Sequence, residues 1–451
     1  MNKVKIKKEL KQFQTSLYNN ALKVHALLAK NGFKSFFVGG FARDLLLGLD
    51  SSDIDIATDA KASEVQKIFN NTIPVGISFG VVIVLMGKDQ FQVSTFRKDI
   101  DYQDGRRPSA VEFTDEVQDV KRRDFRINGL LFDPDSHEIT DCVGGVQDLD
   151  KKVLACIGDP RQRFNEDKLR LFRAVRFAST LNFKIEPETL AAIKEMVDQI
   201  NLVSSERIRE ELEKMLTRPN PHLGLELLFD TGLLKQILPE VFVLREIEQP
   251  KQFHPEGNVF NHVYEMLRLA KVGSEFALFL AVLLHDIGKA TTMELTDRIR
   301  FNNHDKESYQ LSKPICERLK LSNKETDLVL SLIVNHMRFM NVKKMKLSTF
   351  RKFISLERFD LHLELHRLDC LSSHRKMDNY NFVMEKINEL KNENNYVLPK
   401  KLVDGKDLLE LGIAESPIMG EILKEVYDMQ LEGRFKDKEE AMSYVKDKLK
   451  K

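Results

Sequence analysis

Residues 38–58, VGGFARDLLLGLDSSDIDIAT, decide the fold of the first part of the chain. They predict the end of a strand, a glycine turn, a short helix and then a second strand, on which acidic and apolar residues alternate from Asp53 to Ile56. Residues two apart on a strand face the same side, so Asp53 and Asp55 project together while the two isoleucines enter the core. Neighbouring carboxylates repel each other unless cations lie between them, and the pattern therefore favours a pair of divalent metal ions.

The glycine turn before the short helix suits a phosphate group. Gly39 and Gly40 let the backbone approach a phosphate closely, and a helix N-terminus attracts anions. Arg43, one turn into the helix, is placed to clamp a triphosphate. Taken alone, a DxD pair is more often a solvated edge strand, and a double-glycine turn is an equally weak signal. Their order, with the first acid ten residues after Arg43, is much more specific.

Composition and charge bound the class of protein. The chain has 451 residues, 42% of them hydrophobic and 31% charged, which is ordinary for a globular protein of about three domains. Its net charge is +1, so any nucleic-acid contact must come from local basic patches. The four cysteines form no CxxC pair and indicate reduced thiols. The charged N-terminus lacks the apolar segment of a signal peptide, and the most apolar run, residues 276–284, is too short to span a bilayer. We therefore expect a cytoplasmic protein without a membrane partner; the sequence does not indicate an oligomeric state.

Secondary-structure patterns divide the chain near residue 150. Between 35 and 133, short apolar or alternating runs bounded by Gly, Asp and Pro predict strands with short helices between them. Further on, three-to-four spacing predicts almost continuous helix, including 166–181, 258–271 and 276–289. The predicted fold class is α+β. We expect an N-terminal helix (1–30), a head (31–150), a helical neck and body (151–245), a second helical domain (246–375) and a helical tail (376–451).

Five further motifs follow the first one. They are YQDGRRP at 102–108, RRDFRIN at 122–128, DCVGGVQDL at 141–149, EDKLR at 166–170 and SERIREEL at 205–212. Together with residues 38–58 they resemble the motifs of class II tRNA nucleotidyltransferases and of the bacterial poly(A) polymerases related to them. The resemblance covers residues 36–216 and implies a head like the polymerase-β nucleotidyltransferase fold, followed by an all-helical neck, body and tail.

The resemblance also implies roles for individual residues, with ATP and CTP as substrates and tRNA, bound at its 3′ end and elbow, as partner. Asp53 and Asp55 would be catalytic and would hold two Mg²⁺ ions. Residues that would bind or select the nucleotide are Gly39, Gly40, Arg43, Arg123, Asp167, Arg170, Arg173 and Arg176, while Asp124 and Asn128 would order the site. Residues 102–108 would form the flexible loop of the family.

The chemistry of the base edge supports the assignment of EDKLR. Cytosine and adenine present an exocyclic amine beside a ring-nitrogen acceptor, whereas guanine and uracil carry a carbonyl there. An aspartate at 167 can accept from the amine while Arg170 donates to the ring nitrogen, so we expect the two residues to select C and A. On the predicted helix over 166–181, Asp167 and Arg170 share one face. A solvated arginine stripe, worth about 0.2–0.5 kcal/mol per ion pair, is the more frequent explanation of such a pattern in isolation. The preceding motifs favour base reading.

The sequence departs from the family pattern at three positions. Gln92 stands where the family often has a glutamate, which removes an acidic group there. Lys168 replaces the frequent proline of this motif, and Ala42 stands where valine is usual. We expect neither of these last two changes to alter the chemistry.

A second set of metal-binding residue types lies in the helical half. Imidazole and carboxylate groups together suit Mn, Fe, Ni or Mg. Their order, H…HD…H…H…D, resembles that of the HD phosphohydrolase superfamily and implies a metal site with a possible phosphodiesterase or phosphatase side activity. The alternative is a helical domain whose histidines cap or pack, and we assign no role to His254 or the other remaining histidines. The six candidate ligands are His262, His285, Asp286, His304, His336 and Asp369.

These motifs leave three functions open. The first is template-independent addition of CCA, from CTP and ATP, to tRNA 3′ ends with release of pyrophosphate. The second is a poly(A) polymerase or an A-only-adding enzyme; the short tail of mixed charge favours tRNA, and the loop motif argues against a C-only enzyme. The third is an HD-type phosphodiesterase with a non-catalytic RNA-binding head. The acids and arginines of the head motifs are intact, which disfavours the third function.

Overall fold

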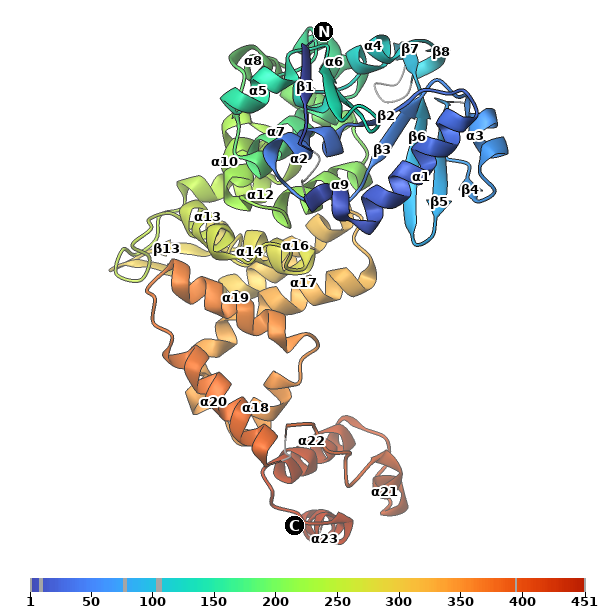
Figure 1. Cartoon of the computed structure of the whole chain (residues 1–451). Coiled ribbons are helices and arrows are strands. Elements are labelled where there is room, and N and C mark those ends of the chain that lie inside the picture. Colours follow the sequence, from blue (N-terminus) through green and yellow to red (C-terminus); the bar gives the residue numbers. More distant parts are fainter. Residues whose placement is uncertain (1, 8–10, 76–78, 103–107, 394–395, 450–451) are drawn as a thin grey trace. The chain divides into compact units, whose positions relative to one another are not determined.

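The computed structural model describes residues 2–7, 11–75, 79–102, 108–393 and 396–449. The chain folds into two compact units, Met1–Pro239 and Glu240–Lys451, which are described separately (Figure 1). Within the described ranges, no helix combines the length and the apolar character needed to cross a membrane.

The first unit begins with a mixed sheet. Its strand order is β1-β10-β9-β2-β3-β6-β5-β4, in which β3 and β6 are parallel and all other neighbours are antiparallel. The strands are β1 (Asn2–Lys5), β2 (Ser35–Val38), β3 (Asp55–Thr58), β4 (Thr72–Ile73), β5 (Val81–Met86), β6 (Asp89–Thr95), β9 (Leu130–Asp133) and β10 (Glu138–Asp141). A separate hairpin of β7 (Arg97–Tyr102) and β8 (Pro108–Phe113) flanks residues 103–107, so most of the predicted flexible loop lies outside the described residues.

Strand β2 is buried on both faces, and this fixes the glycine turn that follows it. Phe37 packs edge-on against Tyr18 of α1 (Ser16–Lys30) and Phe41 of α2 (Gly40–Leu47). Val38 points to the opposite face, since successive strand residues alternate. There it joins a cluster of buried residues that contains Ala57, Phe96, Val120 and Leu131.

The rest of this unit is mainly helical. Helix α7 packs against α9 and α10, and its buried apolar face includes Leu171, Phe172 and Val175. Its arginines recur at three-residue spacing outside that face, as amphipathic patterning requires. The elements are α3 (Ala62–Ile68), α4 (Glu116–Lys121), α5 (Gly145–Lys151), β11 (Val153–Leu154), α6 (Pro160–Glu166), α7 (Arg170–Leu181), β12 (Lys184–Ile185), α8 (Pro187–Glu195), α9 (Ser205–Leu216), α10 (Pro221–Thr231) and α11 (Leu233–Ile237).

In the second unit the described residues form helices and one small hairpin of β13 (Met293–Leu295) and β14 (Ile299–Phe301). Every residue of α14 (Phe276–Leu284) is buried, and this helix contacts α13, α17 and α19. The residues directly after α14 are therefore delivered into the interior. The other helices are α12 (Pro239–Phe242), which starts at the boundary, α13 (Val259–Leu269), α15 (Lys289–Thr292), α16 (His304–Arg318), α17 (Asn323–Asn335), α18 (Leu347–Ile354), α19 (Phe359–Ser372), α20 (Asp378–Asn392), α21 (Gly405–Glu410), α22 (Pro417–Leu431) and α23 (Lys438–Leu449).

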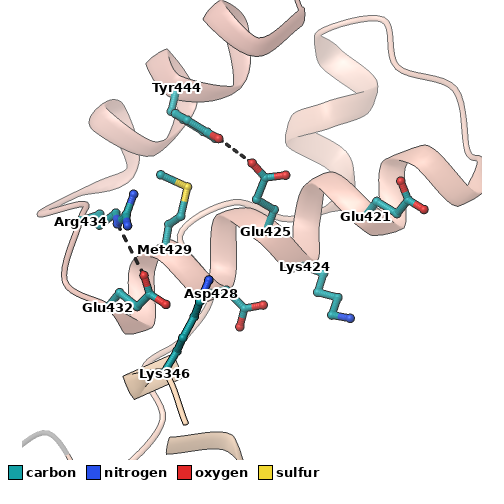
Figure 2. Close-up of a pocket in the computed structure, with 9 residues that line it drawn as sticks. All are labelled: Lys346, Glu421, Lys424, Glu425, Asp428, Met429, Glu432, Arg434 and Tyr444. Atoms are coloured by element: carbon teal, nitrogen blue, oxygen red, sulfur yellow. Dashed lines mark hydrogen bonds and ion pairs between the residues drawn. The ribbon is translucent and has the colours of Figure 1, made fainter. Parts of the chain in front are cut away.

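A surface hollow of 490 Å³ lies along α22 and α23, with Lys346 at its edge (Figure 2). Two of its acidic groups interact within the hollow: Tyr444 donates to Glu425, and Arg434 lies 3.5 Å from Glu432. Acidic side chains outnumber basic ones in its lining, so the hollow does not suit a phosphate backbone.

Candidate functional site

The glycine turn brings two predicted site residues to one point. Gly39 has φ 67° and ψ −124°, a conformation that favours glycine. A Cβ atom at Gly39 would lie 3.6 Å from Arg123 Nη1 and 3.9 Å from Asp55 Oδ2. Arg123 and Asp55 therefore both face the backbone of this turn, where Gly40 begins α2.

The two acids lie at the start of β3. Ile54 and Ile56 are buried, as the alternation predicts. Strand β3 begins at Asp55, however, so Asp53 lies just before the strand and the prediction that both acids are strand residues is wrong. The acids still interact: burial and then the charge of Asp53 raise the pKa of Asp55 to about 6, against the opposing effect of Arg123. A cation would relieve this repulsion, so the pair fits a divalent-metal site.

Arg43 is buried, and its guanidinium is held by protein groups. Nε and Nη2 lie 2.8 and 2.7 Å from Asp44 Oδ1, and Nη1 donates to Asn128 Oδ1 at 2.8 Å. Burial raises the pKa of Asp44, an effect that Arg43 opposes. A direct clamp on a triphosphate would require Arg43 to exchange one of these hydrogen bonds.

Asp124 connects the RRDFRIN motif to α7. Its Oδ1 accepts from Asn128 Nδ2 at 3.1 Å, and its Oδ2 accepts from Arg173 Nε and Nη2 at 3.0 and 2.6 Å. Burial alone would raise the pKa of Asp124, but Arg173 and Arg170 outweigh it and hold the pKa well below its usual range. A hydrogen-bonded chain thus runs from Arg43 through Asn128 and Asp124 to Arg173, an arrangement that orders the site.

Arg173 and Arg176 also pair with Glu211 of α9. The distances are 3.6 Å from Arg173 Nη1 to Glu211 Oε1 and 2.5 Å from Arg176 Nε to Glu211 Oε2. Both guanidinium groups lie over the Phe177 ring, 5.2 and 3.9 Å from its centre. In the described structure these arginines stabilise the packing of α7 on α9.

Two consecutive arginines are aimed by one buried acid. Asp119 accepts from Arg122 at 2.7 Å and from Arg123 at 3.0 Å. Arg170 Nη2 in turn donates to the carbonyl oxygen of Arg122 at 3.0 Å. Arg170 of the EDKLR motif is therefore bonded to the backbone of Arg122. The next residue, Arg123, faces Asp55 across the glycine turn, so Arg170 and Arg123 connect the motif to the acids.

The predicted helix over 166–181 is interrupted, so that prediction is wrong. Helix α6 ends at Glu166, α7 begins at Arg170, and Asp167 between them is extended, with φ −145° and ψ 108°. Asp167 Oδ1 accepts the N–H of Leu169 at 3.1 Å. Such local side-chain bonds compete with the helical pattern and explain the break.

Asp167 and Arg170 consequently do not share a helix face. Asp167 Oδ2 accepts from Arg207 Nη2 of α9 at 2.8 Å. Arg170 Nη1 instead donates to Glu166 Oε2 at 2.7 Å and to a backbone carbonyl oxygen. Each of the two predicted base-reading residues is held by a different partner.

The six candidate ligands of the second unit come together. Asp286 Oδ1 lies 3.3 Å from His304 Nε2 and 3.8 Å from His336 Nε2, while Asp286 Oδ2 lies 3.3 Å from His285 Nε2. Two groups each keep their ligand atoms within 4.8 Å of one another: Asp286, His304 and His336, and His262, His285 and Asp369.

The ring orientation of three histidines fits metal binding. In His285, His304 and His336, Nδ1 lies 3.0, 2.8 and 2.6 Å from the backbone carbonyl oxygen three residues earlier. A carbonyl only accepts, so Nδ1 carries the proton and Nε2 carries the lone pair. Nε2 of His304 and Nε2 of His336 face each other at 3.2 Å, and the buried Nε2 of His285 has no hydrogen-bond partner among the described residues. A cation held between such lone pairs would satisfy them.

His262 lies between two carboxylates. Its Nδ1 is 2.8 Å from Glu256 Oε1, and its Nε2 is 3.2 Å from Asp369 Oδ1. Burial alone would lower the pKa of His262, but contact with Asp369 and Glu256 outweighs burial and raises the pKa to about 9. A metal ion bound at Nε2 would take the place of the proton there.

Sequence reasoning missed four residues around this cluster. Glu256 Oε1 lies 2.8 Å from Nδ1 of His254, to which no role was assigned. Lys289 Nζ lies 2.6 Å from Asp286 Oδ2 and donates to Gln249 Oε1 at 2.7 Å. Glu256, His254 and Gln249 belong to an irregular segment before α13, so no helical spacing marks them. Lys289 could have been found as a cation three residues after Asp286.

Three family models match the chain. The Poly A polymerase head domain matches residues 35–155, the Probable RNA and SrmB- binding site of polymerase A matches 182–244, and the HD domain matches 259–374. Fold and site together therefore define a protein with a polymerase-type head followed by an RNA-binding segment and an HD domain.

Curated relatives narrow this class. The CCA-adding enzyme of Lactococcus lactis subsp. cremoris is 38% identical over 277 residues, which are 57% of this chain and 68% of the relative. The chain belongs to the family of CCA-adding enzymes, which confirms the resemblance seen in the motifs. The CCA-adding enzyme of Enterococcus faecalis is 46% identical over 201 residues, 44% of this chain and 49% of the relative. The chain spans about half to two thirds of the length of the curated relatives it matches.

Solved structures confirm the predicted α+β fold. The Bacillus stearothermophilus CCA-adding enzyme in complex with CTP has a TM-score of 0.75 and 24% identity, covering 97% of this chain and 98% of its own. The Thermotoga maritima CCA-adding enzyme complexed with tRNA has a TM-score of 0.61 and 19% identity, covering 100% of both chains. At these identities the likeness concerns the fold alone.

Proposed function

We propose that this chain adds C and A residues, taken from CTP and ATP, to tRNA 3′ ends and releases pyrophosphate. The observation that carries the proposal is the convergence of Asp55 and Arg123 on the backbone of Gly39, with Asp53 close enough to shift the pKa of Asp55. Membership of a family whose curated relatives are named CCA-adding enzymes supports it.

In the proposed reaction the acids hold the metal and the turn holds the triphosphate. Two Mg²⁺ ions at Asp53 and Asp55 would activate the 3′-hydroxyl and stabilise the leaving pyrophosphate. The Gly39 backbone admits a phosphate where a side chain would block it. Arg123, aimed by Asp119, places a positive charge at the same point.

Base selection falls to Asp167 and Arg170. Asp167 is pinned by the Leu169 N–H and by Arg207, so its carboxylate has a fixed direction from which to accept an exocyclic amine. Arg170 would turn from Glu166 to donate to the ring nitrogen. The pair then rejects G and U because their carbonyl oxygens would meet the carboxylate.

The remaining segments would serve RNA binding. The RNA-binding family match within 182–244 supports RNA contact by the neck and body, and we assign the tRNA elbow to the tail, residues 376–451. We assign the protein to the cytoplasm, the compartment of its proposed tRNA substrate, and its four free cysteines support this assignment.

The test uses purified full-length protein, tRNA lacking its 3′ end, Mg²⁺, and each nucleoside triphosphate separately and together. Incorporation of C and A that stops after CCA supports the proposal. Unlimited addition of A would instead identify a poly(A) polymerase, and addition of a single A an A-only enzyme. If no nucleotide is incorporated, the result would instead support the third function, in which the head binds RNA without catalysing transfer.

A second activity is favoured by the histidine cluster. The facing Nε2 atoms of His304 and His336, next to the Asp286 carboxylate, form a donor set that suits Mn, Fe, Ni or Mg. A metal ion bound there would supply an activated water for phosphoester hydrolysis. Hydrolysis of p-nitrophenyl phosphate and bis-p-nitrophenyl phosphate, measured with each metal, tests this activity; His285→Gln should abolish it.

A further inference from the structure

His262 differs from the other histidines of the HD cluster in the hydrogen-bond partner of its Nδ1 atom. His285, His304 and His336 each donate Nδ1–H to a backbone carbonyl oxygen, whereas His262 Nδ1 faces the Glu256 carboxylate at 2.8 Å. His262 is completely buried, so water cannot replace that partner.

The position of each histidine in its helix explains the difference. His285 and His336 follow α14 and α17, and their acceptors, the carbonyl oxygens of Val282 and Ile333, lie in the last turns, which have no N–H four residues further on in the helix. His304 opens α16, and its acceptor is the carbonyl oxygen of Phe301 in β14. His262 lies inside α13, where the carbonyl oxygen three residues earlier belongs to the helical pattern. The ring therefore needs an acceptor from outside its own helix.

The segment before α13 supplies that acceptor and holds it in place. The N–H of Val259 donates to the carbonyl oxygen of Ile247 at 2.9 Å, which closes the segment into a loop. Asn261 Nδ2 donates to the carbonyl oxygen of Glu256 at 3.1 Å, and His254 Nδ1 lies 2.8 Å from Glu256 Oε1. Backbone and side chain of Glu256 are thus both fixed. The HD family model starts at residue 259, after this segment.

We propose that Glu256 is a positioning residue of the HD metal centre: it holds Nδ1–H of His262, so that Nε2 presents its lone pair toward Asp369 and His285. This inference rests on the proposed metal site. Nε2 of His262 lies 3.2 Å from Asp369 Oδ1, so both atoms could bind one cation, which would replace the proton that Nε2 otherwise carries. Carboxylate partners of this kind orient the ring and make the ligand more basic.

Two roles of Glu256 can be distinguished by experiment: orienting the ring of His262, or binding a metal ion itself. The ligand atoms of His254, Glu256 and His262 also lie within 4.8 Å of one another, so these three residues could form a separate ion site. In that case His254→Gln would remove one bound ion. If Glu256 only positions His262, the number of bound ions stays the same in His254→Gln.

The test measures Co²⁺ binding to the full chain by calorimetry and by visible absorption. All proteins carry Asp55→Asn, so that the head does not contribute. Glu256→Leu removes the carboxylate acceptor and leaves only Ser372 Oγ, 3.3 Å from His262 Nδ1. Glu256→Gln retains an acceptor at this position, and Glu265→Gln, whose side chain is 31% exposed on the same helix, is the matched control. Circular dichroism checks that each variant is folded.

We expect Glu256→Leu to weaken Co²⁺ binding about 10–100-fold and to change the absorption spectrum. Glu256→Gln should stay within about threefold of the parent and Glu265→Gln should equal it, because an acceptor for Nδ1–H remains in both. Unchanged affinity in Glu256→Leu, equal losses in the Leu and Gln variants, or loss of an ion in His254→Gln would each overturn the inference. No Co²⁺ bound by the parent protein would refute the proposed metal site itself, and the inference with it.

Discussion

Arg207 of α9 donates from Nη2 to Asp167 Oδ2 at 2.8 Å, across 40 positions of sequence. The other oxygen of Asp167 accepts the N–H of Leu169. The carboxylate is therefore fixed at both ends, by its own turn and by a second helix. A group that must distinguish an amine from a carbonyl needs such a fixed direction, since a freely rotating carboxylate would adapt to either.

Replacement of Asp167 tests base selection directly. Asp167→Ala should lower kcat/KM for CTP and ATP about 5–150-fold, the equivalent of 1–3 kcal/mol for one base-edge contact, and should narrow the preference over UTP and GTP by a similar factor. Steady-state rates with each nucleotide provide the measurement. Asp150→Asn, at an exposed position of α5, is the control. Unchanged nucleotide choice would remove Asp167 from base reading.

Arg207 should affect selection more than stability. The ion pair with Asp167 is partly exposed, with side-chain exposures of 20% and 19%, and such pairs contribute only about 0–1 kcal/mol to the free energy of unfolding. Arg207→Met should reduce the preference for C and A roughly 2–10-fold, since one hydrogen bond of about 0.5–1.5 kcal/mol is lost. Arg207→Lys, which keeps a donor, should fall between the parent and Met. A large drop in melting temperature with intact selection would contradict this role.

The break between α6 and α7 at Asp167 is the feature of the head that the sequence pattern did not predict. The motif order identified the residues of the head because these motifs are local, with the acids and the glycine turn within 20 positions of each other. The EDKLR segment contains no Gly or Pro, so its residue types do not mark a helix end. What ends α6 is a side-chain bond within the turn and an ion pair to α9, neither of which a periodic pattern contains.

The HD cluster also contains residues that the sequence predicted and residues that it did not. All six ligands were predicted because each stands on or beside a helix in a recognisable order, and the structure brings them together. Glu256 and His254 were missed because they belong to an irregular segment, where position depends on backbone hydrogen bonds such as that from Val259 to Ile247. A histidine six positions from a carboxylate has no signature of its own in a loop.

Asp55→Asn should separate catalysis from folding. The folded-state pKa of Asp55, about 6, lies above the ordinary 3.8, so the folded chain binds the proton more tightly and stability decreases as pH rises through this window. At pH 7.5 the variant should melt about 2–4 °C higher than the parent if about 1 kcal/mol of the cost of burying this charge, and of its repulsion by Asp53, is relieved. Transfer should fall by roughly three orders of magnitude or more, because several kcal/mol of metal-ion stabilisation are lost.

Mg²⁺ provides the complementary readout for the same variant. It should raise the melting temperature of the head more in the parent chain, whose paired acids bind the ion, than in Asp55→Asn, in which only the HD site can still bind it. Asp150→Asn should behave as the parent in both assays. Parent-like turnover in Asp55→Asn would remove the metal assignment.

The HD centre should be dispensable for nucleotide addition. His285 and the head acids belong to different folded units, and residues that share no partners usually act independently. His285→Gln should abolish metal-dependent phosphoester hydrolysis. The rate of CCA addition should stay within about twofold of the parent, because independent sites affect each other by no more than about 0.5 kcal/mol. Both rates are measured on one preparation. Loss of addition in this variant would show that the two units are coupled.

Acid pH should weaken the region around α19 through two buried histidines. Burial lowers the pKa of both His362 and His366 to about 4, and for His362 the charge of Arg338 adds to the effect. The His366 ring is stacked on Phe339 at 4.2 Å, within an apolar cluster. Below the ordinary pKa of 6.5 the unfolded chain takes up protons that the folded chain excludes, so stability present above pH 6.5 is lost as pH falls toward 4.

Each histidine should contribute about 1.4 kcal/mol per pH unit to this loss. Hydrogen exchange of α18, α19 and α20 at pH 7 and pH 5, corrected for intrinsic exchange rates, measures it. His366→Phe keeps the ring stack but cannot be protonated. It should remove about half of the pH dependence of stability, because only His362 then takes up a proton on unfolding. Asn381→Gln, at an exposed position of α20, is the control and should leave the dependence unchanged. An unchanged slope in His366→Phe would mean that other groups govern acid stability here.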